Sequence, residues 1–188
     1  MATDHGRPLV PPRVIKTDYP VIDTDPHVRR VFGYARPSDY TMGAAAGAAG
    51  PLLFHLLDRY HPVGASKGTY GRAMRLAVGI GLITSVLTVY NTSCTRFYGF
   101  TENSREVNMD MREMVDKAKK GEPLYGESSL SPYMQGVAAR NSRYASLFIH
   151  VIPWFNFVNH NQHGVDTAKY YQQAERELEA ERANREMF

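Results

Sequence analysis

Three histidines near the C-terminal end are the side chains whose type and spacing first suggest chemistry. His160 and His163 are three residues apart, which on a helix would place two zinc ligands on one face, and His150 precedes them. Asparagines on both sides of His160, followed by Gly164, make the segment turn-like, and neither a carboxylate nor a cysteine pair stands beside it. The pattern therefore favours structural hydrogen bonding near a helix N-terminus over metal binding.

A second group with the right chemistry lies near the other end of the chain. Asp23, Asp25 and His27 contain the elements of an acid–base set, and Arg29 and Arg30 follow closely. The segment is rich in proline and shows no sign of a pocket, so we interpret the group as surface carboxylates paired with the two arginines.

Other catalytic or binding signatures are missing from the sequence. "GAAAGAAG" lacks the Lys-Ser/Thr of a phosphate-binding loop, and no nucleophile elbow, zincin helix or dinucleotide fingerprint occurs. Cys94 is the single cysteine, which excludes an intramolecular disulfide and a cysteine-based zinc site. With 22 basic and 19 acidic residues the net charge is +3, too small to indicate nucleic acid. We predict no catalytic residues, bound cofactor or metal.

Two long uncharged segments lie in the middle of the chain. Eighteen residues from Tyr40 to Leu57 and twenty from Leu76 to Thr95 carry no formal charge. A hydrocarbon core about 30 Å thick needs roughly 20 helical residues, and a soluble helix normally has a charged face, which neither segment has. We therefore predict an all-α membrane protein with transmembrane helices at 38–58 and 76–95 and a basic loop at 59–75. The alternative is a pair of core helices in a soluble protein.

Small residues mark where the two predicted helices pack. Gly43 and Gly47 form a GxxxG pair, and Gly81, Ser85 and Thr88 share one face of the second segment. In lipid, helices associate through close backbone packing at such residues. The two helices pack either on each other alone or also on helices of other chains. Neither uncharged segment contains Asp, Glu, Lys or Arg, which argues against an ion path.

The flanks of the hairpin are polar. Residues 1–37 read as an extended Pro-rich segment without a matrix presequence, so that an import signal would be internal. Within the region 96–188 we predict an amphipathic helix at Glu106–Lys120, a loop to Pro132 and a solvated helix from Asp166. Between this loop and the solvated helix lies a twelve-residue apolar run, which is too short to span a bilayer. Its aromatic residues suit the membrane interface or a partner's groove: Trp154, Phe155 and Phe157.

Two stretches carry a resemblance to a known family. "YPVIDTDPHVRRVFGYARPSDY" (Tyr19–Tyr40) and "HVIPWFNFVNHNQHGVDTAKYY" (His150–Tyr171) resemble the N-terminal and C-terminal regions of the fungal 21 kDa accessory subunits of NADH:ubiquinone oxidoreductase, which have relatives in plants. Both motifs are long and irregular, and with the spans between them the resemblance covers nearly the whole chain.

The resemblance implies a non-catalytic accessory subunit of mitochondrial complex I, a multi-pass protein of the inner membrane. Its partners would be core and accessory subunits of the membrane arm and membrane lipid, with structural phospholipid possible and no cofactor of its own. The role would be assembly or stability of that arm. A small import or carrier component of the inner membrane is the alternative from another class, and headgroup contact by "GASKGTYGR" in the basic loop is a further option.

Overall fold

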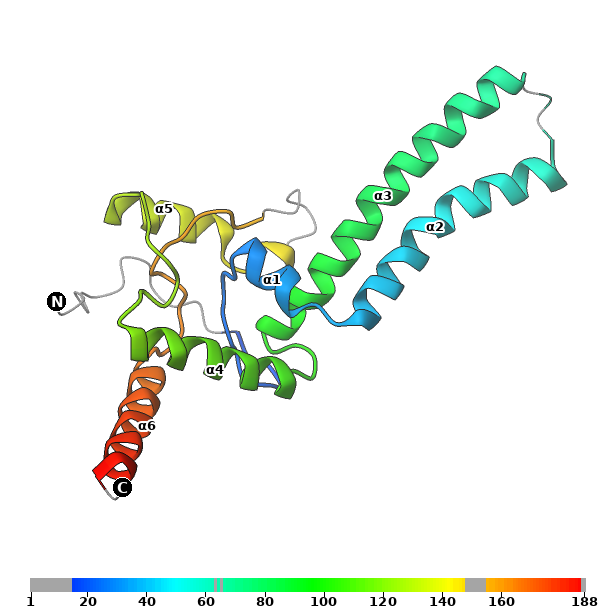
Figure 1. Ribbon diagram of the computed structural model, residues 1–188. Helices are drawn as coiled ribbons and strands as arrows, with labels where there is room; N and C mark the ends of the chain where they lie inside the picture. The colour runs from blue at the N-terminus through cyan, green and yellow to red at the C-terminus, as the bar shows by residue number, and fades with distance from the viewer. Residues whose placement is uncertain (1–14, 63, 65, 148–154, 187–188) are drawn as a thin grey trace. The chain divides into compact units, whose positions relative to one another are not determined.

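The structure is a computed structural model that describes residues 15–62, 64, 66–147 and 155–186. Regular structure in this part of the chain is helical (Figure 1): α1 (Val28–Tyr34), α2 (Pro37–Tyr60), α3 (Lys67–Phe97), α4 (Ser104–Lys120), α5 (Pro132–Ser142), the 3₁₀ turn η1 (Ala145–Leu147) and α6 (Ala168–Glu186). The described residues form no strand, and a parallel bridge between His27 and Asn156 stands by itself. The predicted all-α class is confirmed.

The chain divides into two compact units. One unit comprises Met1–Val28 together with Thr95–Phe188, and the other comprises Arg29–Cys94. The first unit joins segments from both ends of the sequence, whereas the second is a continuous stretch.

In the continuous unit, α2 begins slightly before the expected start of the first span. The backbone N–H of Arg36 donates to the carboxylate of Asp39 at 2.7 Å, and Pro37 occupies the first turn, where its missing N–H has no cost. The helix then continues through Pro51 to Tyr60. Pro51 therefore does not interrupt the helix.

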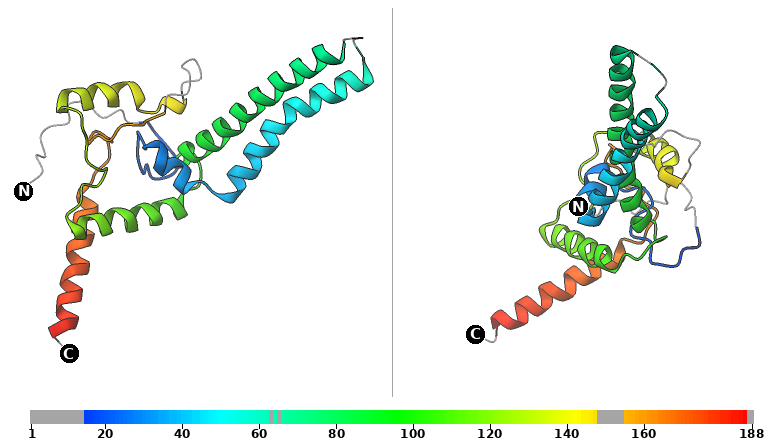
Figure 2. Two further views of the ribbon diagram at one scale, coloured as in Figure 1. Left: turned by 45° about the horizontal axis from the view of Figure 1, so that its top comes forward. Right: turned by 90° about the vertical axis from the view of Figure 1, so that its right-hand side faces the viewer.

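The helix α3 begins well before Leu76, the expected start of the second span. Ser66 caps its first turn, since the Ser66 hydroxyl accepts the backbone N–H of Thr69 at 3.3 Å. Most of the basic residues in the expected loop are consequently helical. Figures 1 and 2 show α2 and α3 side by side and antiparallel, so that the unit is a helical hairpin.

The helix α1 packs against the C-terminal part of α3. Val31 is fully buried, and its carbonyl accepts the hydroxyl of Ser93 at 2.8 Å. The rings of Phe32 and Tyr90 lie 5.9 Å apart between centroids. The Pro-rich N-terminal segment thus contains a helix where only extended chain was expected.

The other unit is built around the packing of α4 against α6. Met114, Leu124 and Tyr170 form its buried cluster, as the amphipathic pattern of α4 requires. Gly121 ends α4 in the left-handed conformation with φ of 70°, at the predicted stop. The helix α5, which starts at Pro132 behind the cap residue Ser131, was not predicted.

Charged side chains join the exposed faces of α4 and α6. Lys119 lies 2.7 Å from the carboxylate of Glu177 and 3.0 Å from that of Glu181. Hydrogen bonding to Glu177 raises the pKa of Lys119, and the same bond lowers the pKa of Glu177. Because these groups are partly or fully exposed, solvent and salt screen the interaction, and it supports the helix pair only weakly.

The buried hydroxyl of Tyr170 supplies a testable measure of the α4–α6 packing. It donates to the buried carboxylate of Asp110, a charge-assisted bond. Replacing Tyr170→Phe removes the donor without opening a cavity, so we expect a loss of about 1–3 kcal/mol of unfolding free energy. Thermal unfolding of the full chain in detergent measures the loss, with Tyr133→Phe on the surface of α5 as the matched control. Equal midpoints for both variants would show that this bond is not stabilising.

Candidate functional site

The first candidate site is the contact between α2 and α3. A β-carbon built on Gly81 would lie 2.3 Å from the carbonyl oxygen of Gly47, and one on Gly47 would lie 2.6 Å from the carbonyl oxygen of Gly81. Real β-carbons do not approach backbone this closely. The two backbones can therefore meet here only because both residues are glycine.

Pro51 explains why the Gly47 carbonyl is available at this contact. Proline has no N–H, so it cannot give the carbonyl four residues earlier its usual helical hydrogen bond. That carbonyl belongs to Gly47, and its oxygen lies against the α-carbon side of Gly81. Such Cα–H···O contacts recur at helix–helix interfaces and offset part of the missing hydrogen bond.

Gly43 and Ser85, two more of the predicted packing residues, extend the contact along α3. A β-carbon on Gly43 would lie 2.9 Å from the carbonyl oxygen of Ser85 and 2.7 Å from Val89. Thr88 is half-buried, and its hydroxyl donates to the carbonyl of Thr84 within its own helix at 2.8 Å. The structure thus brings together both glycines of the GxxxG pair with Gly81 and Ser85. Packing of these residues on other chains stays a prediction.

The outer surface of the hairpin is apolar. Large aliphatic side chains are exposed along both helices: Met42, Leu52, Leu53, Leu56, Leu57, Leu76, Val78, Ile80, Leu82, Ile83 and Val86. Among the described residues, α3 is the one helix long and apolar enough to cross a bilayer by length and composition, and α2 falls short of that standard. Exposed apolar surface on this scale indicates an apolar solvent or a partner.

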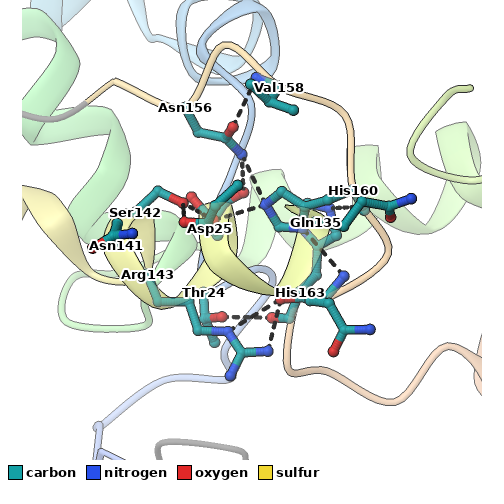
Figure 3. A network of polar contacts seen from close by, with 12 residues as sticks. Thr24, Asp25, Gln135, Asn141, Ser142, Arg143, Asn156, Val158, His160 and His163 are labelled. Carbon is teal, nitrogen blue, oxygen red and sulfur yellow. Dashed lines mark hydrogen bonds and ion pairs between the residues drawn. The ribbon is translucent and has the colours of Figure 1, made fainter. Parts of the chain in front are cut away.

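The second candidate site is a buried polar network in the other unit, centred on Asp25 (Figure 3). The Asp25 carboxylate accepts the Nε2–H of His160 at 2.8 Å and the hydroxyl of Ser142. His160 uses its Nδ1 to accept the backbone N–H of Gln162 at 3.1 Å, which places the ring proton on Nε2. Asn156 donates to the backbone carbonyl of Asp25 at 3.0 Å.

A parallel pair lies beside it. Nδ1 of His163 is 2.7 Å from the carboxylate of Asp23, and Nε2 donates to the carbonyl of His160 at 2.8 Å. The His163 ring stacks between the rings of Tyr125 and His160, with centroids 3.6 Å and 4.5 Å away. Both ring nitrogens of each histidine are therefore used in hydrogen bonds.

Arg143 adds positive charge at the edge of this network. Its guanidinium donates to the carbonyl of Gln162 at 2.7 Å and 3.1 Å, and the backbone N–H of the next residue, Tyr144, donates to the carbonyl of Thr24. Burial lowers the pKa of Arg143, and the nearby charge of Asp25 opposes that shift. The arginine thus helps to compensate two carboxylates that are removed from water.

The network corrects the sequence interpretation of its acidic residues. Asp23 and Asp25 were expected at the surface, but they are 0% and 1% exposed. They are buried because histidines more than 130 residues further along the chain supply their donors. No feature of a single sequence indicates such a pairing, although each segment carries an unusual density of polar residues among apolar neighbours.

The histidines act here as structural donors. His160 and His163 link the C-terminal segment to the N-terminal one, in line with the predicted structural use but with side-chain carboxylates as the main partners. Within the described part of the chain no three His, Cys, Asp or Glu side chains are arranged to hold a metal ion. His150 lies outside the described residues.

The predicted aromatic contact residues are placed in part. Phe157 is exposed and Phe155 half-buried, with ring centroids 5.9 Å apart, while Asn156 between them points into the buried network. Trp154 lies outside the described residues. Contact of these rings with a membrane interface or a partner stays a prediction.

These features define a helical protein with an apolar hairpin and a second unit closed by internal polar contacts. Residues 16–102 match the family described as NADH-ubiquinone oxidoreductase complex I, 21 kDa subunit, and residues 111–187 match the C-terminal family of the same subunit. The NADH-ubiquinone oxidoreductase 20.9 kDa subunit of Neurospora crassa is 64% identical over 170 residues, which cover 90% of each chain. The chain belongs to this family of 21 kDa complex I subunits, as its two sequence motifs predicted.

The helix contact predicts a sharp difference between two neighbouring glycines. Gly81→Ala drives a methyl group into the Gly47 carbonyl, so the helices must separate, and we expect a loss of about 1–3 kcal/mol. Gly79 has open space around its α-carbon, and Gly79→Ala should be neutral or stabilising because alanine favours helix. Thermal unfolding of the full chain in detergent compares the two. Equal unfolding midpoints for the two variants would show that the Gly47–Gly81 contact does not determine how the helices pack.

The buried network predicts an equally specific loss. Asp25→Ala leaves His160 and Ser142 without their acceptor in a buried site, and breaking such pairs costs about 3–5 kcal/mol. Asp25→Asn keeps one acceptor oxygen and should cost less. Asp116→Ala, on the exposed face of α4, is the control and should change little. Denaturant unfolding of the full chain ranks the three, and any other order contradicts the network's role.

Proposed function

We propose that this protein is a non-catalytic accessory subunit of mitochondrial complex I, whose α2–α3 hairpin spans the inner membrane and stabilises the membrane arm. The observation that carries the proposal is the pairing of an exposed aliphatic surface with an internal glycine contact. Such a hairpin has no charged face to give to water and is held together by backbone packing, the means available to helices in lipid.

In this proposal α2 and α3 insert into the membrane together. Of these two helices only α3 is apolar enough to span unaided, but α2 buries Gly43 and Gly47 against it and exposes leucines in its second half. Packing on α3 covers the two glycines in the weakly apolar part of α2, while the alanines beside them stay exposed. This supports two spans, hence a multi-pass protein, although α2 by itself would be a poor membrane helix.

Complex I enters the proposal through the family. The relative from Neurospora crassa is a subunit of NADH-ubiquinone oxidoreductase, and the shared sequence extends over nine-tenths of both chains. The partners we propose are core and accessory subunits of the membrane arm, together with lipid.

The absence of a role in catalysis is part of the proposal. The histidines of the buried network are engaged on both nitrogens with structural partners, so no basic group faces a substrate there. The two uncharged segments offer no titratable carboxylate, lysine or arginine within the membrane. This also weighs against the alternative, an import or carrier component, because charge transfer would need such a group.

Association with complex I provides the decisive experiment. The sample is mitochondria isolated from cells that express the tagged full chain. We expect the protein to co-migrate with complex I on a native gel and to stay in the membrane pellet after alkaline carbonate washing. Gly81→Ala should lower the amount of protein in the complex, whereas Gly79→Ala should not. Wild-type protein found only as a free species, or released by carbonate, would contradict the proposal.

A further inference from the structure

The end of the hairpin where α2 passes into α3 carries a concentrated positive charge. Between Asp58 and Arg75 there are four Lys or Arg residues and one carboxylate, that of Asp58. The four basic side chains are all exposed: Arg59, Lys67, Arg72 and Arg75. They lie on the last turn of α2 and the first turns of α3, so the charge is gathered at one end of the hairpin rather than spread along it.

The basic residues stand where the apolar surface stops. The twenty uncharged residues from Leu76 to Thr95 have the length of the hydrocarbon core at 1.5 Å per residue, and Arg75 immediately precedes them. Lys67 is then about 12 Å further out along the helix. The basic residues therefore occupy the depth of the lipid headgroups if the hairpin spans as proposed.

The direction of one side chain agrees with this depth. Nε of Arg75 donates to the carbonyl of Gly71 at 3.2 Å, one turn nearer the end of the hairpin. The guanidinium is thus turned away from the apolar stretch. Long basic side chains at the end of a membrane helix turn outward in this way to keep their charge at the headgroups.

Aromatic residues complete the boundary at the same end. Tyr60 is exposed, and Tyr70 stacks on Phe54 with ring centroids 5.5 Å apart. The hydroxyl of Tyr70 lies 2.8 Å from Nδ1 of His55, which ties α2 to α3 at this level. Tyrosines with an apolar body and a polar tip are enriched at the headgroup level of membranes. The surface therefore combines a headgroup-depth aromatic pair with an excess of positive charge.

We infer that this end of the hairpin binds the phosphate headgroups of anionic phospholipids. The occupant is a lipid rather than a soluble phosphate, because the cations border directly on exposed aliphatic side chains such as Leu76 and Leu57, which the acyl chains of the same molecule cover. Zwitterionic phospholipids provide no net charge and bind less tightly. The inference rests on the proposed membrane insertion of the hairpin and names the lipid class that surrounds one end of it.

The test uses the full chain purified in a neutral detergent, with short-chain phosphatidylglycerol or phosphatidylcholine added and the bound lipid measured by native mass spectrometry. Phosphatidylglycerol should bind more tightly than phosphatidylcholine. In the double variant Arg72→Gln/Arg75→Gln its affinity should fall about fivefold for each charge removed, hence about 25-fold. The control Arg176→Gln/Arg182→Gln removes the same charge from the exposed face of α6 and should bind phosphatidylglycerol like the wild type.

Each other outcome overturns the inference. Equal affinity for the two lipids would show that the site does not select anionic lipid. Equal losses of phosphatidylglycerol affinity in the two double variants would show that only the net charge of the protein matters. Displacement of the lipid by millimolar inorganic phosphate would make the site one for a soluble anion. Carbonate washing of membranes that contain the same variants keeps the two proposals apart. If the protein stays in the membrane but shows no lipid selectivity, only this inference is contradicted. If carbonate releases the wild type, the proposal of a membrane-spanning hairpin is contradicted.

Discussion

The close approach of two peptide backbones at Gly47 and Gly81 is the constraint on which the hairpin depends. Two helices that expose leucine, isoleucine and valine outward gain nothing in lipid from hiding apolar surface against each other. They associate through contact between atoms, and contact is densest where no side chain keeps the backbones apart. A single methyl group at either position falls within 2.6 Å of a carbonyl oxygen, so the geometry leaves no residue but glycine.

The unit that joins both ends of the chain meets a different constraint, the burial of two carboxylates. An unpaired buried carboxylate is expensive, and Asp23 and Asp25 become tolerable only when donors surround them. Those donors come from His160, His163 and Ser142, far along the sequence. Neither the N-terminal segment nor the C-terminal one is helical here, so side-chain bonds fix their positions together with isolated backbone bonds, such as that from the N–H of Thr24 to the carbonyl of His163. The polar network thus supplies much of the connection that regular secondary structure would otherwise give these segments.

What the sequence could predict follows from the range of the interactions. The hairpin, its small-residue face and the amphipathic helix α4 depend on spacings of three or four residues, and those spacings are readable in one sequence. The pairing of Asp25 with His160 spans 135 residues, and nothing local distinguishes a carboxylate that will be buried from one at the surface. The start of α3 was placed too late for another reason. Charges at Lys67, Arg72 and Arg75 set the limit of the uncharged segment but do not end the helix, which begins at Lys67.

The helix α2 also carries a second surface of small residues. Its second half exposes Leu52, Leu53, Leu56 and Leu57, side chains suited to lipid, while its first half exposes alanines that cover little surface. Because Gly43 and Gly47 already face α3, the alanines at 44, 45, 48 and 49 form a second small-residue surface on another side of the helix. An isolated hairpin would gain from larger aliphatic side chains there. Alanine still leaves room for another helix to pack closely, although its β-carbon holds that helix further away than α3 lies at Gly47, and this fits the proposed role as a subunit of a larger assembly.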